Sequence, residues 1–136
     1  MTSEFIQLLD PPSFIVCDDV RSEIGGKFVL VGVYPGNVIL VRHFPYELRF
    51  WIWAVLVCKK EGSFDAQVRF KATDGTVGGL NRTTFTNSKA GGLTASRMAC
   101  KLEVSGPHRF DAQFRFAGEE GWLTIGHFEV REATGQ

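Results

Sequence analysis

Two segments of the chain alternate between apolar and polar residues almost without exception. One face of the first segment carries Phe64, Ala66, Val68, Phe70 and Ala72, and one face of the second carries Phe110, Ala112, Phe114 and Phe116. A period of two residues is typical of β-strands with one buried face and one solvated face. The turn sequences Asp74-Gly75 and Glu120-Gly121 follow them and suit a tight connection to another strand. We therefore predict that both segments are strands of an antiparallel sheet.

The two alternating segments also resemble each other in sequence. Residues 64–70 are Phe-Asp-Ala-Gln-Val-Arg-Phe, and residues 110–116 are Phe-Asp-Ala-Gln-Phe-Arg-Phe. Internal duplication explains this match, and so does convergence of two strands under the same half-buried constraint. No period recurs elsewhere in the chain, so a repeat architecture is not indicated.

Further strands are predicted from apolar runs that Gly and Pro turns separate. These runs cover residues 14–20, 27–34, 38–42, 46–58, 98–104 and 122–130. Seven or eight short strands of this kind predict an all-β fold, with an antiparallel immunoglobulin-like β-sandwich as first choice. A small barrel or a jelly roll is the alternative.

The remaining segments give weaker predictions. Residues 3–9 hold the only helical pattern, which ends at Asp10-Pro11-Pro12. We expect a single domain over residues 1–136, with an N-terminal extension over residues 1–12 and a flexible tail over residues 131–136. Residues 73–97 are rich in Gly, Thr, Ser and Asn, which predicts a long mobile loop. An edge strand over residues 82–86 is the alternative for part of it.

Segment 46–58 departs from the simple alternation, because it is apolar on both faces. Its even positions form a core face, whereas its odd positions begin with Glu47 and Arg49 and then become Trp51, Trp53, Val55 and Val57. Segments 27–34 and 122–130 are also apolar on both sides, and 27–34 places Val29, Val31 and Val33 on one face. An apolar outer face of this size needs a cover. The N-terminal segment or the long loop, a second subunit, or a ligand would each provide one.

Composition narrows the function further. The chain has 136 residues and a mass of 15.1 kDa, and fifteen Lys and Arg balance fifteen Asp and Glu. The broad basic field that favours nucleic acids is therefore missing. The longest apolar run, residues 50–58, is much shorter than the ~20 residues of a membrane helix. The N-terminus does not look like a signal peptide. We expect a cytoplasmic protein with no nucleic-acid or membrane partner.

Candidate chemistry is sparse along the chain. The usual catalytic motifs are absent, and His43, His108 and His127 lie far apart, so we expect surface or hydrogen-bonded histidines, no cofactor and no enzyme. Three cysteines do not make a disulfide scaffold, and reduced, buried thiols are expected. The pair Asp18-Asp19 is a weak candidate for calcium, and an ordinary ion pair with Arg21 is the alternative.

One segment carries a family resemblance. Its residues are Cys17-Asp18-Asp19-Val20-Arg21, Glu23, Gly25-Gly26-Lys27, Leu30 and Gly32-Val33-Tyr34. Together with residues 106–130, this segment resembles a family of small uncharacterised bacterial and phage all-β proteins, a domain of unknown function. The resemblance covers both ends of the domain, whereas the middle shows little that matches. It implies a fold class but no activity, substrate or catalytic residue.

These observations predict a noncatalytic module that acts by contact with proteins. The predicted contact face is the apolar row Trp51, Trp53, Val55 and Val57, because apolar sheets pair readily and Trp is favoured at the centre of interfaces. We expect a homodimer or a complex with another protein. The alternative is a ligand-binding module, with a carbohydrate stacked on Trp51 and Trp53 or calcium at Asp18 and Asp19.

Overall fold

A computed structural model describes residues 6–134, which form nine strands and one 3-10 turn. The elements are β1 (Ile6–Glu23), β2 (Lys27–Val33), η1 (Pro35–Asn37), β3 (Val38–Val41), β4 (Tyr46–Cys58), β5 (Gly62–Ala72), β6 (Val77–Asn87), β7 (Gly92–Val104), β8 (His108–Phe116) and β9 (Leu123–Glu132). The prediction of an all-β protein is confirmed. The number of strands is nine rather than seven or eight.

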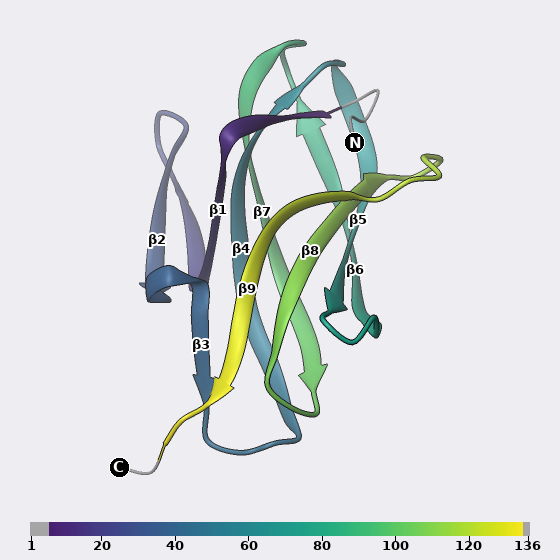
Figure 1. The fold of residues 1–136 in the computed structure, drawn as a ribbon. Helices are drawn as coiled ribbons and strands as arrows, with labels where there is room; N and C mark the ends of the chain where they lie inside the picture. Colours follow the sequence, from purple (N-terminus) through teal and green to yellow (C-terminus); the bar gives the residue numbers. More distant parts are fainter. Residues whose placement is uncertain (1–5, 135–136) are drawn as a thin grey trace.

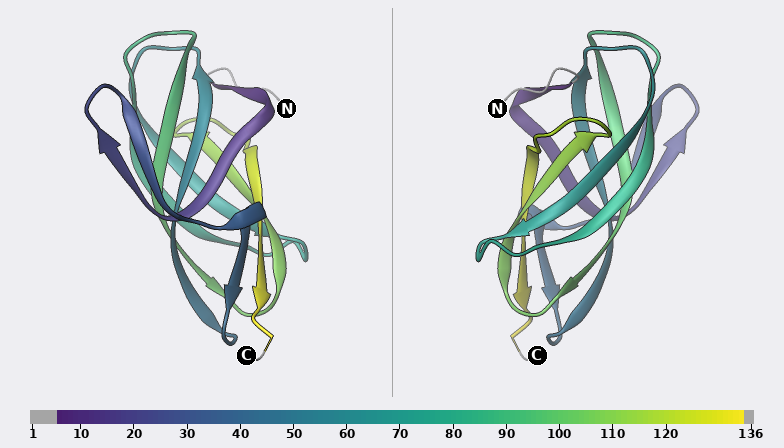
Figure 2. Two further views of the ribbon diagram at one scale, coloured as in Figure 1. Left: turned by 90° about the vertical axis from the view of Figure 1, so that its left-hand side faces the viewer. Right: turned by 90° about the vertical axis from the view of Figure 1, so that its right-hand side faces the viewer.

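The strands form two sheets that face each other (Figure 1). One sheet has four strands in the order β2-β1-β4-β7, and the other has five in the order β3-β9-β8-β5-β6. Neighbouring strands are antiparallel except β3 and β9, which are parallel. The prediction of a fully antiparallel arrangement is therefore wrong for this pair. Figure 2 shows that the sheets are strongly curved.

The core lies between the two sheets and is rich in phenylalanine. Phe50 of β4 contacts Phe70 of β5 and Phe128 of β9, with ring centroids 5.5 and 5.2 Å apart. The predicted core face of β4 is confirmed from Leu48 to Cys58, whereas Tyr46 is exposed. Burial of these apolar side chains is the main force that holds the sheets together.

The two similar segments lie side by side in β5 and β8. They pair antiparallel about Val68 and Phe114, which brings Gln67 opposite Arg115 and Arg69 opposite Gln113. Equivalent positions of the two segments thus exchange places across a local two-fold axis. The same environment acts on both strands, which is the constraint that the convergence hypothesis requires.

Residues 6–12 belong to β1 rather than to a helix. Ile6 pairs with Cys58 and Leu8 with Leu56, and the register then shifts before Ser13. The helix prediction failed because Ile6 is fully buried against the core, so tertiary packing decided the local conformation. The two prolines fall at this register shift, where a missing backbone donor is tolerated. Residues 3–5 lie outside the described part of the chain.

The prediction of a mobile loop over residues 73–97 is wrong, because β6 and the start of β7 occupy most of it. The alternative of an edge strand over residues 82–86 is confirmed, since β6 is the last strand of its sheet. Phe85 is buried. The Asn87 side-chain amide donates hydrogen bonds of 2.9 and 3.0 Å to the carbonyls of Lys60 and Lys89. The polar composition misled the prediction because an edge strand leaves most of its side chains in water.

A β-bulge explains why segment 122–130 looks apolar on both faces. The pairing with β8 passes from Thr124 opposite Gln113 to Gly126 opposite Ala112, so Ile125 is an extra residue. Ile125 and Phe128 are therefore both buried in the core, although their positions have opposite parity. His127 was expected on the face of Leu123 and Ile125, but the bulge places it on the exposed outer face.

Candidate functional site

The end of β1 and all of β2 form a hairpin, residues 17–33, that leans over the outer face of the four-stranded sheet. Figures 1 and 2 show the hairpin as an arm beside the sandwich. The ring of Phe28 lies edge-on to Trp53, with centroids 6.5 Å apart. Arg97 of β7 donates a hydrogen bond of 3.2 Å to the carbonyl of Val20. The chain therefore covers part of its own apolar face, and it does so with a segment other than the expected terminus or loop.

The predicted apolar row of β4, Trp51, Trp53, Val55 and Val57, lies on this outer face, and all four residues are half-buried. Trp51 stands between Cys17 of β1 and Ala99 of β7. Trp53 stands between Ile15 and Arg97. Among the described residues, the Trp53 Nε1 atom is the one buried side-chain nitrogen or oxygen without a hydrogen-bond partner. Such an unsatisfied donor costs roughly 1–3 kcal/mol.

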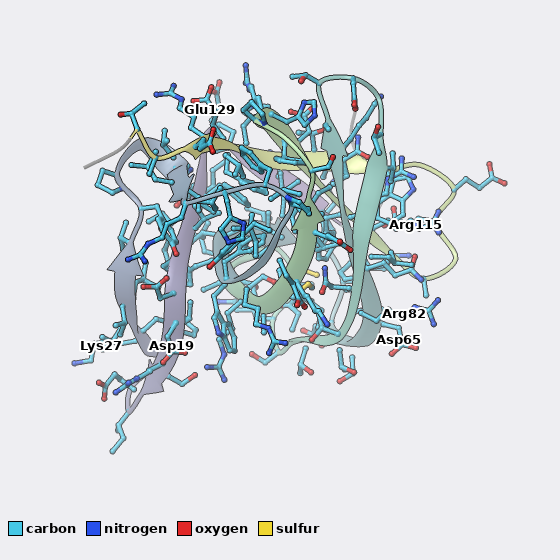
Figure 3. The ribbon with its side chains drawn as sticks, turned by 90° about the horizontal axis from the view of Figure 1, so that it is seen from below. Asp19, Lys27, Asp65, Arg82, Arg115 and Glu129 are labelled. Atoms are coloured by element: carbon cyan, nitrogen blue, oxygen red, sulfur yellow. The ribbon has the colours of Figure 1, made fainter. Side chains whose placement is uncertain are left out.

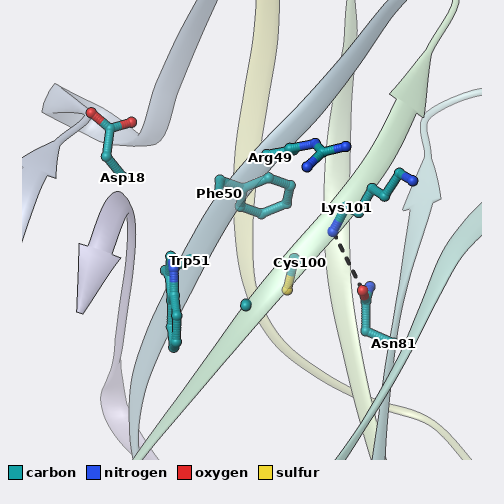
Figure 4. Close-up of a pocket in the computed structure, with 8 residues that line it drawn as sticks. Asp18, Arg49, Phe50, Trp51, Asn81, Cys100 and Lys101 are labelled. Atoms are coloured by element: carbon teal, nitrogen blue, oxygen red, sulfur yellow. Dashed lines mark hydrogen bonds between the residues drawn. The ribbon is translucent and has the colours of Figure 1, made fainter. Parts of the chain in front are cut away.

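A pocket of about 330 Å³ opens beside Trp51 at the base of the hairpin (Figure 4). It is lined by Asp18, Arg49, Phe50, Trp51, Asn81, Ala99, Cys100 and Lys101. The Asn81 Oδ1 atom accepts a hydrogen bond of 3.3 Å from the backbone N–H of Lys101, which fixes the amide at the rim. The pocket thus combines an aromatic ring with a carboxylate, an amide and two cations.

Asp18 and Asp19 already have protein partners. The Tyr34 hydroxyl donates to the Asp18 carboxylate at 2.5 Å, and Arg21 pairs with Asp19 at 3.1 Å. Burial raises the pKa of Tyr34 to about 12, and the hydrogen bond to Asp18 adds to this effect. Successive residues of a strand point to opposite faces, so the two carboxylates do not converge. Within residues 6–134, no cluster of three or more His, Cys, Asp or Glu is placed to hold a metal.

The outer side of the hairpin exposes apolar residues. Val29, Val31 and Val33 of β2 are 39, 38 and 47% exposed, and Ile24 at the tip is 95% exposed. Their alternation was visible in the sequence as one face of segment 27–34. What the sequence did not reveal is that β2 is the outermost strand of its sheet, with β1 as its neighbour on one side.

The outer face of the five-stranded sheet carries a polar network that the sequence analysis missed. Arg69 donates to Gln113 at 2.8 Å, and Arg115 donates to Gln67 at 2.9 Å. Both guanidinium groups lie 4.3 Å from the ring centroid of Trp122. Figure 3 shows Arg115 on this side of the molecule, far from Asp19 and Lys27 on the hairpin. The repeated Gln-x-Arg sequence was the signal, since the pairing of equivalent positions brings these groups together.

The histidines and cysteines occupy unremarkable positions. His127 forms a hydrogen bond of 2.7 Å with Asp111, and His108 forms one of 3.2 Å with Thr73. The prediction of hydrogen-bonded histidines is confirmed for these two. Cys17, Cys58 and Cys100 are free and buried, as predicted. Burial raises the pKa of the Cys100 thiol to about 12, so this thiol is a poor nucleophile at neutral pH.

Comparison with known proteins gives a family but no function. No helix among residues 6–134 is long and apolar enough to cross a membrane. No curated protein matches the sequence at a significant level. Residues 12–113, from the middle of β1 to the middle of β8, match the sequence profile of DUF6941. The match covers well over half of the chain, and the protein therefore belongs to this family of unknown function.

Proposed function

We propose that the protein is a noncatalytic interaction module with an immunoglobulin-like fold, which associates with a second copy of itself through the outermost strand of its four-stranded sheet, β2. The contact surface is the strip of exposed valines on the hairpin, and the half-buried row of β4 packs beneath the hairpin through Trp53. His108 and His127 have partners on the surface and do not line the pocket beside Trp51, which supports a noncatalytic role. The three unpaired cysteines support a reducing compartment such as the cytoplasm.

The order of the strands supports the immunoglobulin-like assignment. In immunoglobulin domains one sheet contains strands A, B and E in that order, and the other contains G, F, C and C′. Here β1-β4-β7 reproduces the first order and β9-β8-β5-β6 the second. The correspondence also follows the order along the chain. β2 and β3 are then additions between strands A and B, and strand D has no counterpart among the described residues.

The exposed valines of β2 are the observation that carries the proposed contact. An outermost strand presents unpaired backbone groups, and proteins usually protect such edges with charges, prolines or bulges. Between Lys27 and Val33, β2 has no charged residue after Lys27 and no proline. Val29, Val31 and Val33 therefore form an apolar strip along an unprotected edge.

A second copy is the partner that this edge fits best. Two identical strands can pair antiparallel about a two-fold axis, so that each satisfies the free backbone groups of the other. The valine strips then continue across the axis on one side of the joined sheet. A two-fold contact is closed, which stops growth at the dimer and protects the edge from further association.

Charge substitution at the edge tests this proposal. Val31→Lys places a charge in the middle of the strip, and we expect its dimer to dissociate at least tenfold more readily than that of the wild type. Leu40→Lys is the matched control, because Leu40 is 61% exposed on β3, an outermost strand of the other sheet. Sedimentation equilibrium measures both dissociation constants. Equal values for the two variants contradict the assignment of the contact to β2.

The pocket beside Trp51 favours a carbohydrate ligand as second candidate. A sugar ring can stack on the indole while Asp18 and Asn81 accept and donate hydrogen bonds at its rim. We expect saturable changes in Trp emission with a neutral oligosaccharide such as cellohexaose or chitohexaose, and their loss in Trp51→Ala. Trp122→Ala is the control, since Trp122 lies on the other sheet. An unchanged emission with every sugar in such a panel contradicts this candidate.

A further inference from the structure

The sandwich is open along one side, between the outermost strands β6 and β7. β6 pairs with β5 and β7 pairs with β4, so each has a neighbour within its sheet on one side only. Between them runs a groove of about 440 Å³. It is lined by Trp51 and by two continuous runs, residues 82–86 of β6 and residues 95–99 of β7. The groove is thus bordered by two strand edges that face it.

The side chains around the groove suit an extended segment that lies along it. Thr83, Thr84 and Thr86 come from β6, and the β7 run contributes small residues at Ala95, Ser96 and Ala99. Because these side chains are small, the backbone of an added strand can approach the edge of β7 closely. Five residues of extended chain span about 16 Å, which sets the length of segment that the groove accommodates.

The charged side chains that line the groove are all basic. Arg82 and Arg97 line it, and none of the described residues that line it is acidic. Arg82 is exposed, and Figure 3 shows its side chain at the edge of the molecule. One N–H of Arg97 donates a hydrogen bond to the carbonyl of Val20. The Arg97 guanidinium lies 6.0 Å from the centre of the Trp51 ring. An incoming segment therefore meets two cations, which favour carboxylate side chains.

We propose that this groove binds an extended acidic peptide segment of another protein by β-strand addition. The segment pairs its backbone with the free edge of β6 or β7, and its carboxylates face Arg82 and Arg97. Backbone pairing supplies the affinity and the alternating side chains supply the specificity, as in other cases of strand addition. A segment that pairs with β7 extends the four-stranded sheet at the position that strand D occupies in immunoglobulin domains.

This site is separate from the proposed self-association. The groove adjoins β7, whereas the apolar strip lies on β2, at the opposite edge of the same sheet. Peptide binding and dimer formation can therefore fail independently of each other. The Val31→Lys variant should bind the peptide as the wild type does, which keeps the two tests distinguishable.

A designed peptide tests the proposal. The probe is a blocked octapeptide of sequence Thr-Val-Glu-Val-Asp-Val-Glu-Thr, and the control peptide replaces its three acidic residues with Lys. We expect saturable binding of the acidic peptide by isothermal titration calorimetry and at least tenfold weaker binding of the lysine peptide. Arg82→Glu should weaken the acidic peptide roughly five- to tenfold, whereas Arg109→Glu, an exposed arginine of β8, should leave binding unchanged.

Hydrogen exchange separates strand addition from simple ionic attraction. Backbone pairing should slow exchange of amides within residues 82–86 or 95–99 when the acidic peptide is bound. An acidic peptide with N-methylated backbone groups should lose both the protection and the binding. No saturable binding of the acidic peptide, equal binding of the lysine peptide, or binding without protection of either run would overturn the proposal.

Discussion

At the scale of single residues, the two sheets approach each other closely at Gly126. A Cβ atom there would lie 2.1 Å from the ring of Phe14, which belongs to β1 of the other sheet. Gly126 is also the residue that follows the bulge of β9. The glycine is therefore required by space rather than by backbone conformation, since the position has no positive φ.

Gly126→Ala should accordingly destabilise the protein, because Phe14 must move away from a packed interface. We expect the free energy of unfolding to fall by roughly 1–3 kcal/mol in urea denaturation. Gly106→Ala is the control, since its Cβ would meet nothing within 4 Å and its φ is not positive. A loss of equal size in both variants would show that contact with Phe14 is not the cause.

The hydrogen bond from Tyr34 to Asp18 gives a prediction about pH. Burial, followed by this hydrogen bond, raises the pKa of Tyr34 from 10.0 to about 12. A group with a raised pKa stabilises the fold fully below its unfolded value, and this contribution is lost as the pH rises through the folded value. Stability should therefore decline between pH 10 and pH 12.

Comparison with Tyr34→Phe isolates this effect from Cys100, whose pKa is also raised to about 12 and which both proteins retain. The decline in thermal midpoint over this pH range should be smaller in the variant. The chain has two tyrosines, Tyr34 and Tyr46, so absorbance titration of the variant should also lose the tyrosinate step near pH 12. A variant that still shows this step would assign the raised pKa to the wrong tyrosine.

At the scale of elements, parity alone predicted much of the sandwich. The alternation of residues 64–72 and 110–116 placed β5 and β8 correctly, and the even face of β4 was identified as core. Three features could not be predicted from local pattern. The bulge at Ile125 reverses the parity of buried positions in the middle of β9. Ile6 belongs to the sheet because it pairs with the distant strand β4, which buries it. Strand β6 has few buried side chains, and Phe85 holds it against the core.

The candidate site was predicted in part. Trp51 and Trp53 were correctly recognised as an apolar outer face, because their parity is opposite to that of the core residues of β4. The folding of the hairpin over Trp53 was not predicted, because the local sequence pattern does not show which segment covers the outer face of β4. The groove between β6 and β7 was also missed, because most of its lining residues come from segment 73–97, which was expected to be a loop.

The hairpin itself can be tested through Phe28. Phe28→Ala removes the ring that lies against Trp53, so Trp emission should shift to longer wavelength and quenching by acrylamide should increase. We expect a loss of about 1–2 kcal/mol in the free energy of unfolding, since Phe28 is only half-buried. Val29→Ala changes the neighbouring, outward-facing residue and should leave the emission unchanged. Identical spectra of Phe28→Ala and the wild type would contradict the contact.

At the scale of the whole molecule, the two edges of the four-stranded sheet differ in character. β2 offers an apolar strip, whereas β7 borders a groove with two arginines and no acidic side chain among the described residues that line it. The two edges lie at opposite ends of the strand order of one sheet. We interpret the domain as a connector, with self-association at one edge and recognition of an extended segment at the other.

The formal net charge of zero fits this interpretation at the same scale. A chain without net charge meets no long-range repulsion when two copies approach, so short-range apolar contact can decide their association. The dimer should therefore depend little on ionic strength. Peptide binding in the groove should weaken as salt is added, because it relies on Arg82 and Arg97.

The mass of the wild-type protein in solution tests the central claim most directly. Light scattering after size exclusion should give a mass near twice 15.1 kDa, falling toward that of the single chain only on strong dilution. Such a result supports self-association, and the Val31→Lys variant then tests whether the contact lies at the edge of β2. A mass of 15.1 kDa at every concentration would contradict self-association and with it the proposed function.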